Sequence, residues 1–214
     1  MYKAVATLAA AAILGTTLQN GQAAAPAADT VMSNLVQNAP TPRTFKADTS
    51  LNLKKRGFPW TKISLQGISY FQAPNRLAIR FNKVPGYMSG LPQAYAKVLN
   101  VGAWPEQYNA TLGRQQTFGG HTDYTLILTP KTGGSDRGVA LVDPSNWTVE
   151  QVSWNLSGGV QLSMIENYAK VEEYRVPSSQ QVSVRTPYAS ADGTATLRDY
   201  TVNVPIDDQI FTQK

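Results

Sequence analysis

The sequence predicts a mainly β protein with a strongly curved antiparallel sheet, arranged as a sandwich or a barrel. Segments with alternating apolar and polar residues recur about every ten residues from position 44 onward, which is the spacing typical of these folds. The alternation slips at 150–151 and again at 198–199. Such slips predict β-bulges, which strongly curved sheets need. The length of 214 residues fits one domain.

Residues 1–25 have the three parts of a secretory signal peptide. Lys3 supplies the positive charge, residues 4–18 form a short and mainly apolar run, and three alanines at 23–25 supply small residues for cleavage. A membrane anchor that is never cleaved is the alternative, but the run is short for a membrane span. No later stretch approaches the roughly 18 apolar residues of a transmembrane helix. We therefore expect an exported protein with no transmembrane segment after cleavage.

The chain contains no cysteine, so it has no disulfide framework and no lipid-attachment cysteine after the signal. This composition is unusual for a small secreted eukaryotic domain but ordinary for a bacterial periplasmic protein. The formal net charge is +5, and no basic helix or aromatic-basic stripe indicates a nucleic-acid partner. These observations predict a periplasmic location.

Residues 26–42 are expected to form a linker and a short helix. Apolar residues at 31, 32, 35 and 36 fall on one helix face, Asp29 is placed to cap the helix N-terminus, and Pro40 and Pro42 end the helix. The rest of the chain, 43–214, is expected to form one domain.

The first strands of that domain are predicted from strict alternation. Residues 44–53 have one apolar face, and residues 77–81 repeat the pattern after a turn at Pro74. Between them, the alternation of residues 60–71 slips at Gly67, so that a bulge or a sharp bend is expected there. Three such segments with short links predict an antiparallel meander. Later strands are predicted at 124–128, 139–141, 147–154, 160–171, 181–188 and 195–204.

Residues 84–105 interrupt the strands and predict an insertion that carries a helix. Apolar residues recur at helical spacing between 91 and 99, and Pro92 fits the first helical turn. Two interpretations stay open. The segment is either a plug that fills one end of the core, or a lid over an apolar cavity.

The residues do not predict a catalytic site. The single histidine, His121, lies two residues before Asp123, but no Gly-x-Ser-x-Gly element supplies a nucleophile. A hydrolase around this pair is kept as an alternative. Metal binding is not predicted, because the chain has no cysteine, one histidine and no carboxylates at ligand spacing. The adjacent acids at 172–173 and 207–208 point to opposite faces of a strand and form no catalytic pair. We expect no enzyme activity, cofactor or metal.

Five segments follow one another in an informative order. They are the short helix at 29–38, Thr-Phe-Lys-Ala at 44–47, the glycine, strand, proline and hairpin at 67–77, Leu-Ile-Leu-Thr-Pro-Lys at 126–131, and the hairpin at 139–154. This order resembles the LolA-like family of periplasmic lipoprotein carriers, the outer-membrane lipoprotein-sorting proteins. The resemblance implies an open β-barrel of about ten to eleven strands, closed by helices around an apolar cavity for acyl chains. The chain departs from the family at Ala73, where the carrier has an arginine, and at 84–105.

The predicted function is that of a periplasmic carrier or chaperone for lipid or for the acyl chains of lipoproteins, with a protein of the inner or outer membrane as partner. Each buried methylene contributes about 0.8 kcal/mol, so an acyl chain needs no specific chemistry to bind. The alternative is a protein-binding or sensor module of the same fold without a free lipid cavity. The predicted cavity wall comprises Phe45, Leu51, Leu53, Ile63, Leu65, Leu77, Ile79 and Phe81. The predicted lid comprises Tyr87, Met88, Leu91, Tyr95, Leu99 and Trp104.

Overall fold

A computed structural model describes residues 26–212 except 58 and 60. The expected signal peptide at 1–25 lies outside the described residues. In the described part of the chain, no helix combines the length and the apolar character needed to cross a membrane.

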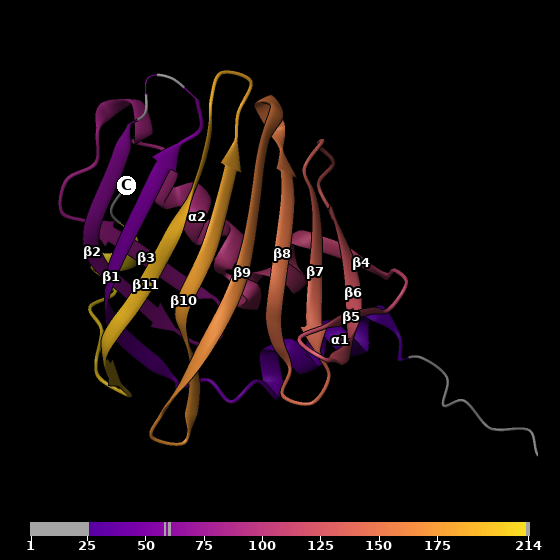
Figure 1. Cartoon of the computed structure of the whole chain (residues 1–214). Coiled ribbons are helices and arrows are strands. Elements are labelled where there is room, and N and C mark those ends of the chain that lie inside the picture. Colours follow the sequence, from indigo (N-terminus) through magenta and orange to yellow (C-terminus); the bar gives the residue numbers. More distant parts are fainter. Residues whose placement is uncertain (1–25, 58, 60, 213–214) are drawn as a thin grey trace, which may run out of the picture.

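The described residues form one antiparallel sheet of 11 strands (Figure 1). Its strand order is β3-β2-β1-β11-β10-β9-β8-β7-β6-β4, and β5 pairs with β6. The strands are β1 (Thr44–Lys55), β2 (Lys62–Gln72), β3 (Arg76–Phe81), β4 (Tyr108–Leu112), β5 (Gln116–Phe118), β6 (His121–Pro130), β7 (Arg137–Asp143), β8 (Thr148–Leu156), β9 (Val160–Val171), β10 (Tyr174–Arg185) and β11 (Ser190–Val202). The sheet is strongly curved and open, because the path ends at β3 and β4 without joining them. The predicted fold class is confirmed.

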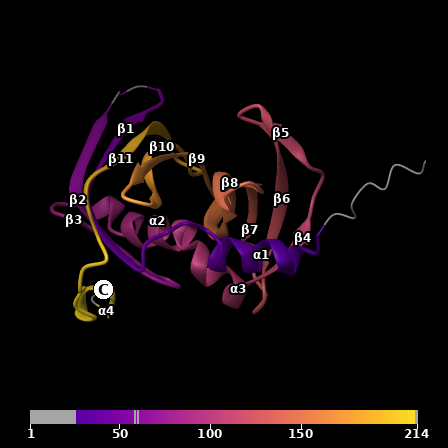
Figure 2. The same ribbon diagram turned by 90° about the horizontal axis from the view of Figure 1, so that it is seen from below.

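Three helices, α1 (Ala28–Gln37), α2 (Leu91–Leu99) and α3 (Trp104–Gln107), lie inside the curve of the sheet and across its open side (Figure 2). The short helix α4 (Gln209–Thr212) contacts β3 outside the curve. Single turns of 3-10 helix occur at η1 (Gly86–Met88), η2 (Val101–Ala103) and η3 (Ser157–Gly159). The expected cap of α1 is wrong: Ala27 holds the N-cap position without a side-chain hydrogen bond, and Asp29 lies in the first turn. A carboxylate at that place still interacts favourably with the helix dipole.

Gly67 does not cause the expected bulge. The pairing of β1 with β2 runs through Thr49 opposite Gly67 without a shift. A Cβ atom at Gly67 would lie 2.0 Å from the carbonyl oxygen of Arg80 on β3, so glycine permits close approach of two strands rather than a bend. The strand therefore keeps its phase, and Ser69 faces inward, where its hydroxyl hydrogen-bonds with that of Thr49 at 2.7 Å.

The other two predicted bulges are confirmed. The register of β7 with β8 shifts between Leu141 and Val142, opposite Glu150. The register of β1 with β11 shifts between Lys46 and Asp48, opposite a segment that contains Asp199 with a φ of 53°. Each extra residue bends its strand and increases the local twist, which contributes to the curvature around the helices.

Candidate functional site

An apolar cavity of about 160 Å³ lies between the concave face of the sheet and the helices. The sheet side of its lining comes from β1, β2 and β3, from β8, β9 and β10, and from Leu197 on β11. The helix side comes from the C-terminal end of α1 and from α2, η2 and Trp104. The curvature of the sheet produces this arrangement, because it brings β3 and β8 to face the same helix, α2.

Six residues of the predicted ligand-binding set line this cavity: Phe45, Leu77, Ile79, Tyr95, Leu99 and Trp104. Three others, Leu51, Leu53 and Leu65, are buried in the main core, and Ile63, Phe81, Met88 and Leu91 pack against that core. Tyr87 belongs to η1. A role for any of these residues in ligand binding stays a prediction.

The insertion is held in place at both the core and the surface. Tyr95 and Val98 are the buried residues of α2. At the surface, the ammonium group of Lys97 lies 3.1 Å from a carboxylate oxygen of Asp136, in the connection between β6 and β7. The side chain of Asn100 donates a hydrogen bond of 2.6 Å to the carbonyl of Asn75. The helix therefore covers the cavity and also contributes to the core.

Part of the cavity lining is polar. Glu166 on β9 and Gln180 on β10 are both buried, and the Gln180 amide donates a hydrogen bond of 2.9 Å to Oε2 of Glu166. Oε1 of Glu166, Oε1 of Gln180 and the hydroxyl of Tyr95 are buried without a hydrogen-bond partner among the described residues. All three side chains line the cavity. Such atoms are costly in a protein interior, so this part of the lining is suited to a polar group of a ligand.

Burial raises the pKa of Glu166 to about 8, although the hydrogen bond from Gln180 acts in the opposite direction. The carboxyl group is therefore mainly neutral at pH 7 and can donate as well as accept a hydrogen bond. Sequence reasoning missed this residue. Its place in the alternation of β9 could have revealed it: Leu162, Met164 and Glu166 occupy every second position of the strand, and all three are buried. The carboxylate therefore lies on the apolar face of the strand.

No protein-family model matches the sequence, and no curated protein matches it. The solved structures that are similar to the chain in fold include the following three. A DUF1329 family protein from Desulfovibrio piger has a TM-score of 0.65 and 12% sequence identity, covering 87% of this chain and 98% of its own. An outer membrane lipoprotein-sorting protein domain from Vibrio parahaemolyticus has a TM-score of 0.60 and 12% identity, covering 85% and 94%. A LolA superfamily protein from Nitrosomonas europaea has a TM-score of 0.53 and 12% identity, covering 88% and 99%.

Identity at this level shows the fold and leaves the ligand open. The likeness extends over nearly the whole of each related structure, and the order of helix, sheet and insertion agrees with the motifs in the sequence. The chain has a LolA-like fold.

Proposed function

We propose that this protein is a periplasmic carrier that binds an acyl chain of a lipid or lipoprotein in the cavity beneath α2, without catalysis. The observation that carries the proposal is the cavity itself, which combines a mainly apolar lining with a few unpartnered polar atoms. Most small-molecule sites in proteins have this composition: a mainly apolar surface with a few polar groups that fix orientation.

The size of the cavity decides how a ligand would enter. Its volume is about 160 Å³, whereas sites for drug-sized ligands have roughly 300–1,000 Å³. A long acyl chain therefore requires α2 to move away from the sheet. Such a movement would break the Lys97–Asp136 ion pair, which is partly exposed and contributes only about 0–1 kcal/mol, and it would also disturb the packing of Tyr95 and Val98. Burial of the methylene groups of the ligand, at about 0.8 kcal/mol each, would offset these losses.

The polar part of the lining favours a ligand with a carbonyl or carboxyl oxygen. Glu166 in its neutral form carries one O–H donor, and its Oε1 has no partner within the described residues. A hydrogen bond from this group to an ester or carboxyl oxygen would satisfy both partners. The acyl chain would then extend from Glu166 toward Phe45, Leu77 and Leu99, which line the apolar part of the cavity.

The first test is native mass spectrometry of protein purified from periplasm, followed by lipid extraction and titration with a fluorescent fatty acid. We expect a copurifying lipid or acylated peptide near one equivalent, and uptake of the probe. A clean mass without uptake would overturn the carrier proposal and favour the protein-binding alternative.

A matched pair of variants on α2 tests the location of the ligand. Leu99→Asp places a charge in the cavity lining, whereas Gln93→Asp places it on the exposed side of the same helix. We expect the first to weaken probe binding at least tenfold and the second to leave it unchanged. Leu99→Phe, which fills part of the cavity without a charge, should also weaken binding. Thermal unfolding of each variant separates lost binding from lost folding. Equal probe binding by all three folded variants would place the ligand elsewhere.

A further inference from the structure

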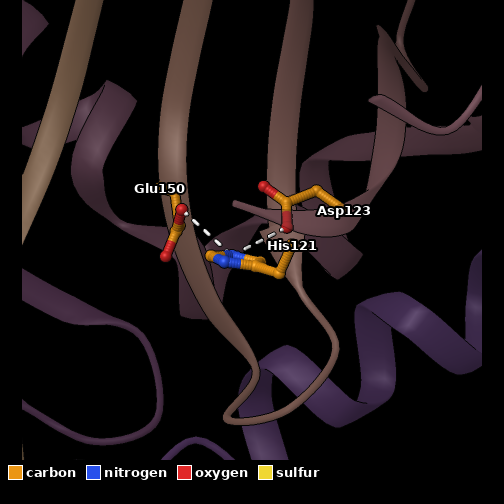
Figure 3. Close-up of side chains that lie close together, drawn as sticks. All are labelled: His121, Asp123 and Glu150. Atoms are coloured by element: carbon orange, nitrogen blue, oxygen red, sulfur yellow. Dashed lines mark ion pairs between the residues drawn. The ribbon is translucent and has the colours of Figure 1, made fainter. Parts of the chain in front are cut away.

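A second cluster of polar side chains lies on β6 and β8 (Figure 3). Nε2 of His121 is 3.1 Å from Oδ1 of Asp123 and 3.3 Å from Oε2 of Glu150. One ligand-type atom from each residue lies within 4.8 Å of the other two. The cluster is on the sheet face opposite the core, because Asp123 alternates with Tyr124 and Leu126, which pack on the core side. It is therefore separate from the acyl-chain cavity.

Buried atoms of this cluster lack hydrogen bonds within the described part of the chain. The side chain of Asp123 is 0% exposed, and neither of its carboxylate oxygens has a hydrogen-bond partner there. Nε2 of His121 is also buried without one, although it lies close to two carboxylates. An unpartnered nitrogen and unpartnered carboxylate oxygens that lie this close together are an arrangement that a shared cation would satisfy.

The two distances from Nε2 of His121 agree with ligands on one ion. Zn²⁺ binds nitrogen and carboxylate oxygen at about 2.0–2.2 Å. Two ligand atoms at angles of roughly 90–110° on such an ion are then about 2.8–3.6 Å apart. The two separations from Nε2, 3.1 and 3.3 Å, fall within that range.

Asp143 on β7 has a different part in the cluster. Its Oδ2 atom is 3.9 Å from Nε2 of His121, and its carboxylate already accepts a hydrogen bond of 2.7 Å from the backbone of Ser145 and another from the Asn146 amide. This carboxylate is hydrogen-bonded within its own turn and lies farther from Nε2 than Asp123 and Glu150 do, so it adds negative charge beside the site and is not assigned as a ligand.

Two local features of the backbone leave room for the cluster. The bulge at Glu150 interrupts the regular register of β8 with β7. In the turn before β6, a Cβ atom on Gly119 would lie 3.2 Å from Cε1 of His121 and 3.7 Å from Oε2 of Glu150. Gly119 also has a φ of 56°, which favours glycine. Bulges frequently re-aim a side chain toward a functional site.

We propose that His121, Asp123 and Glu150 bind one divalent first-row transition-metal ion, for which Zn²⁺ and Mn²⁺ are the probes. One imidazole and two carboxylates suit such ions, and water would complete the coordination. The site joins β6 to β8 across β7, so the bound ion would stabilise this half of the sheet. No metal site was expected from the sequence, because sequence spacing alone does not reveal that Glu150 lies beside His121.

The test uses untagged protein that has been stripped with a chelator and dialysed. His121 is the only histidine of the chain, so the imidazole proton resonances report on this site alone. We expect Zn²⁺ to shift these resonances with saturation at one equivalent, and calorimetry to give the same stoichiometry. Mn²⁺ should compete and should broaden the same signals. Metal analysis after dialysis should recover one ion per chain.

Asp123→Asn keeps the shape of the buried side chain and removes its charge, and Glu150→Gln does the same for the second carboxylate. Each should weaken Zn²⁺ binding at least a hundredfold, whereas Asp199→Asn, an exposed change of equal charge, should not. Without metal, the Asp123→Asn variant should unfold at the same temperature as the parent or higher, so lost binding cannot be attributed to lost folding. Absence of one-equivalent binding to the parent protein, or equal binding by the Asp123→Asn and Glu150→Gln variants, would overturn the proposal and leave a cluster of acids around the histidine without a metal.

Discussion

Replacing Gly102 with alanine is expected to destabilise the protein by more than about 3 kcal/mol, within the range of the most damaging single substitutions. The added Cβ atom would lie 1.6 Å from the carbonyl oxygen of Pro74 and 2.6 Å from its carbonyl carbon. Both atoms belong to the backbone of the turn between β2 and β3, so no side-chain rotation relieves the overlap. Either η2 or the turn has to move, and the 2.6 Å hydrogen bond from Asn100 to Asn75 is then lost as well.

The matched control is Gly86→Ala. Gly86 lies at the other end of the insertion, and an added Cβ atom there meets nothing within 4 Å. Its expected effect is within about 0.5 kcal/mol, as for most surface substitutions. Urea unfolding followed by tryptophan fluorescence measures both variants. Equal urea midpoints for the two variants would show that η2 does not pack against the turn between β2 and β3 in solution. Since Pro74, Val101 and Gly102 also line the cavity, the same experiment tests one of its walls.

The fold was predictable because alternation is a local signal. Along β1, buried residues occupy every second position from Phe45 to Leu53, as the sequence pattern indicates. The bulges at Glu150 and Asp199 were also predictable, because an extra residue shifts the alternation. The interrupted alternation at Gly67 was misinterpreted as a bulge. The alternation is interrupted because a polar residue, Ser69, occupies an inward position, where its hydroxyl hydrogen-bonds with the buried hydroxyl of Thr49 on the neighbouring strand. Sequence alone does not show which neighbour a strand has.

The candidate sites were harder to predict because they depend on pairing between strands. Glu166 and Gln180 become partners only when β9 pairs with β10 in the observed register. The carboxylates around His121 come from three strands, and Asp143 is opposite Thr148 in the pairing of β7 with β8. Neither group of residues has a regular spacing in the sequence that would indicate a site. The apolar residues of the cavity could be predicted, because they lie on strand faces that the alternation defines or on helix faces that the helical spacing defines.

The buried carboxyl of Glu166 should make the stability of the protein depend on pH in a defined direction. Its ordinary pKa is 4.5, and burial raises it to about 8 in the folded protein. Between these values the folded state binds the proton more tightly than the unfolded state. The free energy of unfolding therefore falls as pH rises from about 4.5 to about 8, and changes little on this account outside that window. One pKa unit corresponds to about 1.4 kcal/mol, so the loss is at most about 5 kcal/mol.

Glu166→Gln is expected to remove most of that dependence, because glutamine stays neutral at every pH and its carbonyl can still accept the hydrogen bond from Gln180. The variant should be close to the parent protein at pH 5 and more stable than the parent by a few kcal/mol at pH 8.5, at most about 5 kcal/mol. Urea unfolding across this pH range measures the difference. Glu173→Gln, at an exposed position of the turn between β9 and β10, controls for the change in net charge. A parent protein whose stability is flat between pH 5 and 8.5 would show that Glu166 reaches solvent, and would remove the neutral O–H donor from the proposed lipid site.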